Sequence, residues 1–150
     1  MILNLGEEEG LKRAFWELKG RFGADSEILV SKMMTGGVEV FIGAKVDETF
    51  GPVATFGLGG TALELLGDVS LRLCPVSPEE ALAMVKELKT QALLTGFRGA
   101  KPCRLSAVAE AVSRVSRLMM SYPDITEMDI NPLIARQDGV TAVDALMVLK

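Results

Sequence analysis

The chain has 150 residues, of which 49% are hydrophobic and 5% aromatic, and its net charge at pH 7 is −4. This length suits one domain with an aliphatic core, so we predict a single domain over residues 1–150. No apolar run approaches the roughly 20 residues that span a bilayer, and no basic cluster stands out. We therefore expect neither a membrane nor a nucleic-acid partner.

The cysteine and histidine content indicates the cellular compartment and excludes several kinds of catalytic site. Cys74 and Cys103 make no disulfide framework, so a reducing cytoplasm is expected. The chain has no histidine. This excludes a Ser-His-Asp triad, a Cys-His pair and a histidine metal site within the chain.

Helical and extended patterns alternate through the first half. An apolar stripe at helical spacing predicts a helix from near Gly6 to Gly23. Residues 27–34 and 38–46 read as two strands joined by a Thr35-Gly36-Gly37 turn, which predicts a hairpin. Shorter strands are expected over 53–56, 61–66 and 68–75.

Three features of this half carry polar or glycine chemistry. The Gly57-Leu58-Gly59-Gly60 run lets backbone N–H groups approach an anion, although a tight bend explains it equally well. Glu39 is either an exposed alternate residue of an apolar strand or a ligand contact. Arg72 suits phosphate or carboxylate, and a solvated surface position is the alternative.

The second half contains two helices and a hairpin. Ser77, Pro78 and Glu80 predict a capped helix start, and a second helix is expected over residues 105–121. A strand from Glu127, a turn over 136–139 and a return strand over 140–149 predict the hairpin. This hairpin-rich pattern predicts an α+β fold, with a mainly antiparallel sheet covered by about three helices.

The final hairpin holds the candidate metal ligands. Asp129 and Asn131 are two apart and face the same side of an extended strand, and the return strand brings Asp144 beside them. Two carboxylates and one amide oxygen suit a hard cation such as magnesium. A polar strand end with an Asn-Pro turn explains the same residues, and both interpretations stay open.

Several stretches together resemble the ATP-grasp domain of the ADP-forming acyl-CoA synthetases, which include acetate–CoA ligase (ADP-forming). The beta subunit of succinyl-CoA synthetase is a more distant likeness. The resemblance covers essentially the whole chain and is carried by Gly37-Val38-Glu39-Val40, Phe50-Gly51-Pro52-Val53, Phe56-Gly57-Leu58-Gly59-Gly60, Asp68-Val69-Ser70-Leu71-Arg72-Leu73, Gly96-Phe97-Arg98-Gly99 and Glu127-Met128-Asp129-Ile130-Asn131-Pro132-Leu133 with Asp144-Ala145.

The resemblance implies a ligase that uses ATP and forms ADP, with magnesium on the nucleotide phosphates. Asp129, Asn131 and Asp144 match the family's magnesium positions. Glu39 matches a position that contacts the ribose hydroxyls. Arg72, as a catalytic residue, and the nucleotide-binding Gly57, Gly59 and Gly60 match positions facing the phosphoryl-transfer centre.

The chain also departs from this family. Ser31-Lys32 replaces the usual Gln-Glu of the adenine hinge, and the front half of the domain and the CoA-binding portions are not in this sequence. We therefore expect a carboxyl-terminal portion of the domain, inactive alone, working with a CoA-binding subunit or domain. The alternative is a non-catalytic remnant that binds a partner or senses nucleotide, or a regulatory domain of a protein acetyltransferase.

The expected gap in the domain also predicts exposed apolar surface. We expect Met33, Phe41 and Phe56 to lie on a partly uncovered sheet face. Because uncovered apolar patches recruit partners, this favours a homo-oligomer or a tight heterologous complex.

Overall fold

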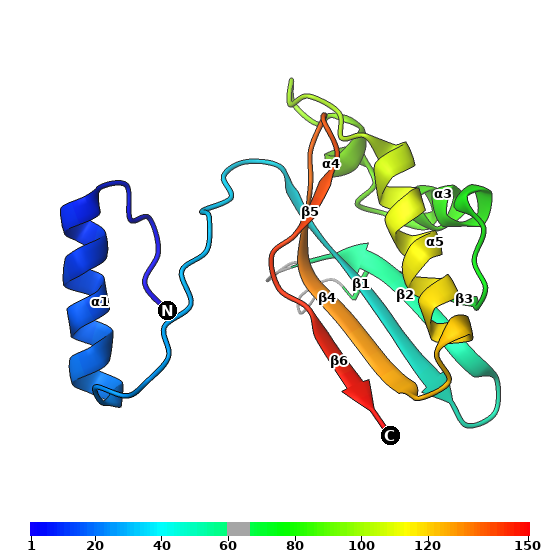
Figure 1. Ribbon diagram of the computed structural model, residues 1–150. Helices are drawn as coiled ribbons and strands as arrows, with labels where there is room; N and C mark the ends of the chain where they lie inside the picture. The colour runs from blue at the N-terminus through cyan, green and yellow to red at the C-terminus, as the bar shows by residue number, and fades with distance from the viewer. Residues whose placement is uncertain (60–66) are drawn as a thin grey trace. The chain divides into compact units, whose positions relative to one another are not determined.

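The computed structural model describes residues 1–59 and 67–150. The contacts within the chain divide it into two compact units, Met1–Thr35 and Gly36–Lys150, and each is described by itself (Figure 1). The single domain predicted over residues 1–150 stays a prediction. No helix among the described residues is long and apolar enough to cross a membrane.

The first unit contains helix α1, Glu8–Phe22, close to its predicted bounds. Glu8 and Glu9 lie in its first turn and Lys19 and Arg21 in its last, where each sign of charge favours the helix dipole. Gly23 ends the helix with a φ of 99°, a left-handed value that suits glycine.

The strand predicted over residues 27–34 is wrong, because the structure assigns neither helix nor strand there. Its intended partner, β1 (Val38–Asp47), is hydrogen-bonded to β2 (Gly51–Leu58) on one side and to β4 (Ile125–Ala135) on the other. Both edges of β1 are therefore occupied by strands from later in the chain. The predicted first hairpin is replaced by β1 and β2.

The second unit is built on an antiparallel sheet, which confirms the predicted α+β class (Figure 1). Its strand order is β3-β2-β1-β4-β5, and β6 also pairs with β4. The remaining strands are β3 (Val69–Leu73), β5 (Val140–Ala142) and β6 (Leu146–Leu149). The strand predicted over 61–66 lies outside the described residues.

Helices α3 (Pro78–Glu87) and α5 (Leu105–Ser121) pack on one face of this sheet, and a short helix, α4 (Ala92–Thr95), joins them. The predicted capping box of α3 is confirmed. The Glu80 N–H donates to the Ser77 hydroxyl at 3.2 Å, and the Ser77 N–H donates to the Glu80 carboxylate at 2.8 Å. This reciprocal pairing explains why the helix begins at Pro78.

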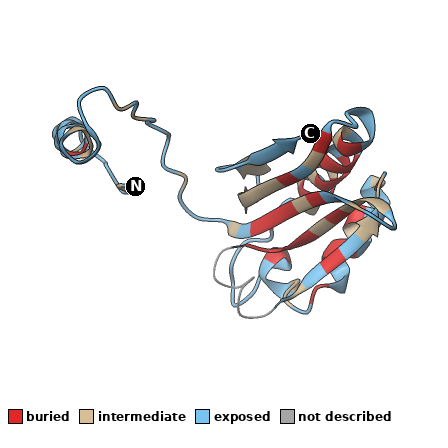
Figure 2. Ribbon diagram, turned by 90° about the horizontal axis from the view of Figure 1, so that it is seen from below, coloured by how far each residue is buried: buried red, intermediate tan, exposed pale blue. Residues whose placement is uncertain are grey.

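The core lies between the sheet and these two helices, where Figure 2 shows buried residues on both layers. The strands contribute Val40, Ile42 and Phe56, each fully buried. We call this side of the sheet the covered face. The opposite side, which we call the open face, includes the exposed side chains of Lys45, Leu71 and Leu73.

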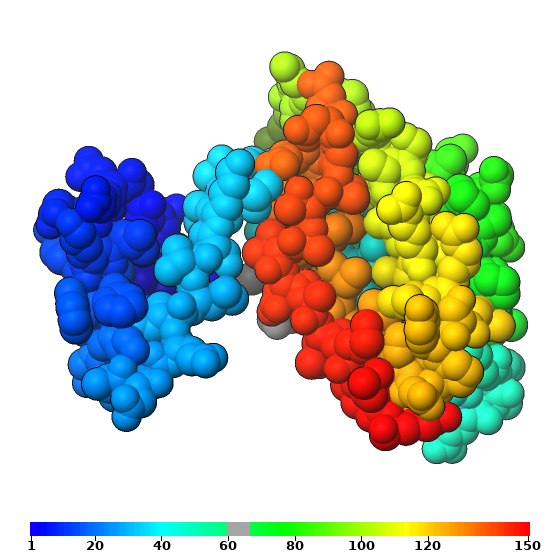
Figure 3. All heavy atoms as spheres, in the orientation of Figure 1, coloured from blue at the N-terminus to red at the C-terminus, as the bar shows by residue number. Residues whose placement is uncertain are grey.

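The exposed apolar surface predicted near Met33, Phe41 and Phe56 is wrong for the two aromatic residues. Phe41 is 7% exposed and Phe56 is 0% exposed. Apolar exposure in this unit instead includes the edge strands β3 and β6. The residues of β6 lie at the surface in Figure 3 (red). The expected self-association stays a prediction.

Candidate functional site

Strand β4 bends where the sequence placed the candidate ligands. Its pairing with β1 shifts between Val40 and Ile42, so that Phe41 faces two residues of β4, Asn131 and Pro132. The Asn131–Pro132 peptide bond is cis. Pro132 has no N–H to donate to the ladder, and a bulge is where a sheet tolerates such a residue.

The predicted return strand over 140–149 is interrupted beside this bulge. β5 pairs Ala142 with Leu133, and β6 pairs Leu146 with Asp129, so the register is the same on both sides of the break. The Val143 N–H donates to the Pro132 carbonyl at 3.0 Å. Asp144 therefore lies in the break, across from Asn131, as the sequence predicted for the hairpin.

Asp129 lies on the open face, directly across from Gly43 of β1. It is half-buried, and its carboxylate makes no hydrogen bond or ion pair with another residue of 1–59 or 67–150. Burial, with the negative charges of Glu127 and Asp144, raises the pKa of Asp129. Glu127 and Asp144 therefore each lie close enough to Asp129 to disfavour its ionised form.

Asn131 lies against the backbone of Gly59. The Gly59 N–H donates to the Glu39 carbonyl at 2.8 Å, which extends the pairing of β1 and β2 by one residue. A Cβ at position 59 would lie 3.0 Å from the Val40 carbonyl oxygen and 3.3 Å from Asn131 Oδ1. Glycine at 59 therefore leaves the room in which the Asn131 amide sits.

Of the other two glycines in this run, the structure describes Gly57 but not Gly60. A Cβ at Gly57 would lie 2.6 Å from Phe41 Cε1 and 2.8 Å from the Asp68 carbonyl oxygen, so close packing requires glycine there. Gly60 lies outside the described residues. Glu39 is exposed near the start of β1, and its contact with ribose stays a prediction.

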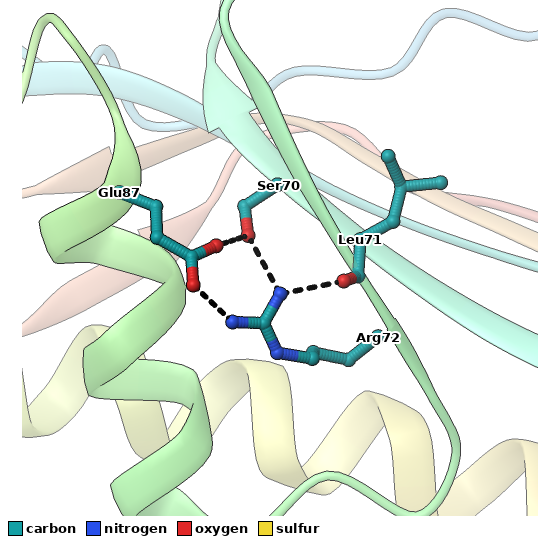
Figure 4. A network of polar contacts seen from close by, with 4 residues as sticks. All are labelled: Ser70, Leu71, Arg72 and Glu87. Carbon is teal, nitrogen blue, oxygen red and sulfur yellow. Dashed lines mark hydrogen bonds and ion pairs between the residues drawn. The ribbon is translucent and has the colours of Figure 1, made fainter.

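Arg72 is not brought together with these residues. It pairs with the buried Ala54, which places it on the covered face, and Glu87 of α3 binds its guanidinium (Figure 4). Arg72 Nη1 also donates to the Leu71 carbonyl at 2.8 Å, and the Ser70 hydroxyl donates to Glu87 at 2.7 Å. The predicted contact of Arg72 with phosphate stays a prediction.

Sequence reasoning gave no role to Lys45, Thr55 or the Glu127 carboxylate. Together with Phe41 and Asp129 they line a shallow hollow of about 150 Å³ on the open face. The alternation of side chains along β1 could have placed Lys45 and Phe41 on the same face. Thr55, Glu127 and Asp129 come beside them only through the pairing of β1 with β2 and β4.

A family model described as an ATP-grasp domain matches residues 1–149. The chain belongs to the ATP-grasp domain family. It is 42% identical to acetate–CoA ligase (ADP-forming) I of Archaeoglobus fulgidus over 98% of this chain and 22% of that protein. It is 43% identical to the beta subunit of acetate–CoA ligase (ADP-forming) I of Pyrococcus furiosus over 81% of this chain and 53% of that subunit.

A solved structure agrees with the fold of this ATP-grasp chain. Acetyl-coenzyme A synthetase 1 of Ca. Korarchaeum cryptofilum, in complex with coenzyme A and Mg-AMPPCP, matches with a TM-score of 0.91 at 41% identity. The match covers 99% of this chain and 67% of that chain. The chain thus spans about a fifth to a half of the curated relatives described above.

The candidate ligands fit a magnesium ion by their chemistry. Asp129 and Asp144 supply carboxylates and Asn131 an amide oxygen, all hard donors. No three Asp, Glu, Cys or His side chains converge on a metal position within residues 1–59 and 67–150, so a site here depends on the Asn131 amide. Burial, and after it the charges of Glu127 and Asp144, raises the pKa of Asp129, and a cation bound there would favour its ionised form.

Proposed function

We propose that this chain is part of an ADP-forming acyl-CoA synthetase and supplies ligands for ATP and magnesium during phosphoryl transfer. One observation carries the proposal: the β4 bulge and the break between β5 and β6 set Asp144 across from Asn131, beside Asp129, on the open face. The named relatives support the reaction class, since they are ADP-forming ligases of acetate and CoA.

The proposal gives a role to each group of candidate residues. Asp129, Asn131 and Asp144 would hold magnesium, which when bound neutralises charge on the nucleotide phosphates. Glu39 would accept hydrogen bonds from the ribose hydroxyls. The Gly57-Leu58-Gly59-Gly60 run would lie near the phosphates, where small residues let the backbone approach. Positioning and charge stabilisation are most of what phosphoryl transfer asks of a protein.

The rest of the reaction depends on other segments. The resemblance to this family implies that ATP first phosphorylates a histidine of the enzyme. The chain contains no histidine, so that residue would come from outside it. Coenzyme A would bind to a separate domain or subunit, which is the partner that we propose. We therefore expect no acyl-CoA formation by the chain alone.

One observation favours a second candidate, a non-catalytic nucleotide-sensing module. Ser31 and Lys32 stand where the family carries its adenine hinge, and both are exposed outside any helix or strand. Loss of this hinge would weaken nucleotide binding. The two candidates differ in whether turnover returns when the remaining segments are supplied.

The test joins this chain to the segments of the Archaeoglobus fulgidus relative that it does not span. We expect this chimaera to form acetyl-CoA from acetate, CoA and Mg-ATP, and the chain alone to form none. Calorimetry with Mg-ADP should give binding in both forms, weaker for the chain alone. Binding without turnover in the chimaera would favour the sensing module, and no binding in either form would refute both.

A further inference from the structure

The hollow on the open face is lined by Gly43 and by side chains of β1, β2 and β4. Gly43 lies at its centre, with Phe41 and Lys45 on either side along β1. Thr55 of β2 and Asp129 of β4 lie directly across from Gly43. A Cβ at Gly43 would make ordinary van der Waals contact with the Phe41 ring at 3.7 Å and with Thr55 Cβ at 3.8 Å, so Phe41 and Thr55 lie close above this glycine.

The charges around the hollow are uneven. Glu127 and Asp129 contribute two carboxylates, and Lys45 contributes the one cation among the described residues of the lining. Lys45 is exposed and lies directly across from Glu127, yet it forms no ion pair with any residue of 1–59 or 67–150. Its ammonium is therefore available to an incoming anion, which the two carboxylates would otherwise repel.

We propose that Lys45 positions the terminal phosphoryl group of a bound nucleoside triphosphate in the hollow over Gly43. The inference rests on the proposed function, because Asp129 belongs both to the magnesium set and to the wall of this hollow. A metal held by Asp129 would bring phosphate oxygens to the lining that Asp129 shares with Lys45. The ammonium has three N–H donors, and the Thr55 hydroxyl supplies one more from β2.

Lys45 and the metal ligands should affect different nucleotides. The metal ligands should act on diphosphate and triphosphate alike, and Lys45 mainly on the triphosphate. A diphosphate bound to the metal would reach the Asp129 wall of the hollow, whereas a triphosphate extends by one further phosphoryl group, which we place at Lys45. Lys45 should therefore discriminate Mg-AMPPCP, a triphosphate analogue, from Mg-ADP. A purely structural lysine would affect neither or both.

The test measures binding of Mg-AMPPCP and Mg-ADP by calorimetry in the chimaera described above. We expect Lys45→Met to weaken Mg-AMPPCP binding about tenfold, the effect of losing one charged hydrogen bond, and Mg-ADP binding less than about twofold. Lys45→Arg should restore most of the lost affinity. Lys86→Met, on an exposed position of α3, is the matched control and should change neither nucleotide.

The outcomes separate this inference from the function beneath it. Equal affinity of the original chain and Lys45→Met for Mg-AMPPCP would overturn the role of Lys45 while leaving the synthetase proposal intact. An equal loss for both nucleotides would also overturn it, whether or not the melting temperature falls. Failure of the unsubstituted chimaera to bind either nucleotide would overturn the proposed function itself.

Discussion

The two faces of the sheet treat their charged residues differently. On the covered face, Arg72 is bound by Glu87, and Ser70 donates to the same carboxylate (Figure 4). The Arg72 hydrogen bond, followed by that of Ser70, lowers the pKa of Glu87. On the open face, Asp129 has no such partner among the described residues, and its pKa is raised.

This contrast separates a carboxylate that is paired within the fold from one that has no partner among the described residues. A carboxylate that accepts hydrogen bonds from a cation and a hydroxyl is stabilised in its ionised form. A half-buried carboxylate beside two others is destabilised in its ionised form. A perturbed carboxylate on a concave, open surface is the stronger indicator of a binding site.

The largest effect is expected from removing a proposed metal ligand. Asn131→Ala removes an oxygen ligand of the cation, and Asp144→Asn removes the negative charge of one. Each should weaken Mg-ADP binding by at least about tenfold. Calorimetry of the chimaera measures this. Asp138→Asn, an exposed residue of the same hairpin, is the control. Unchanged affinity in both ligand variants would leave a bulged Asn-Pro turn without a metal role.

A smaller effect is expected when the paired region is broken. Arg72→Met should lower the melting temperature by about 3 °C, since Glu87 and Ser70 lose their partner between β3 and α3. Arg114→Met removes an exposed ion pair within α5 and should change it by less than about 1 °C. A loss of nucleotide affinity without loss of stability would instead support the phosphate contact predicted for Arg72.

The smallest effect concerns pH and the unpaired carboxylate. Because the pKa of Asp129 is raised in the fold, its ionised form opposes folding; this cost is absent below the unfolded pKa and complete above the folded one. Without metal, Asp129→Asn should therefore raise the melting temperature slightly at pH 7.

Thermal unfolding at several pH values would measure this gain, which should vanish below pH 3.8, the ordinary pKa of the group. Glu48→Gln, in the exposed β1–β2 turn, is the control. A gain that persists at the lowest pH would mean that the ionised Asp129 carboxylate is not its cause.

Local chemistry made much of the fold predictable. Ser77 and Glu80 cap α3 through residues three apart, and the stripe of α5 repeats every three to four residues, so neither depends on the rest of the chain. The strand wrongly predicted over 27–34 shows the limit of this reasoning. A short apolar run is compatible with a strand, but it forms one only where a sheet edge is free to pair with it. Both edges of β1 are already paired, one with β2 and the other with β4.

The sequence by itself determined the chemistry available to the site: two aspartates and an asparagine near Pro132, and no histidine. Only the tertiary structure decided which residues share a face. The bulge at Asn131 and Pro132, the break around Asp144 and the position of Arg72 on the covered face all follow from strand register. Register is set by pairing between distant segments, and a shift of one residue turns a side chain to the opposite face.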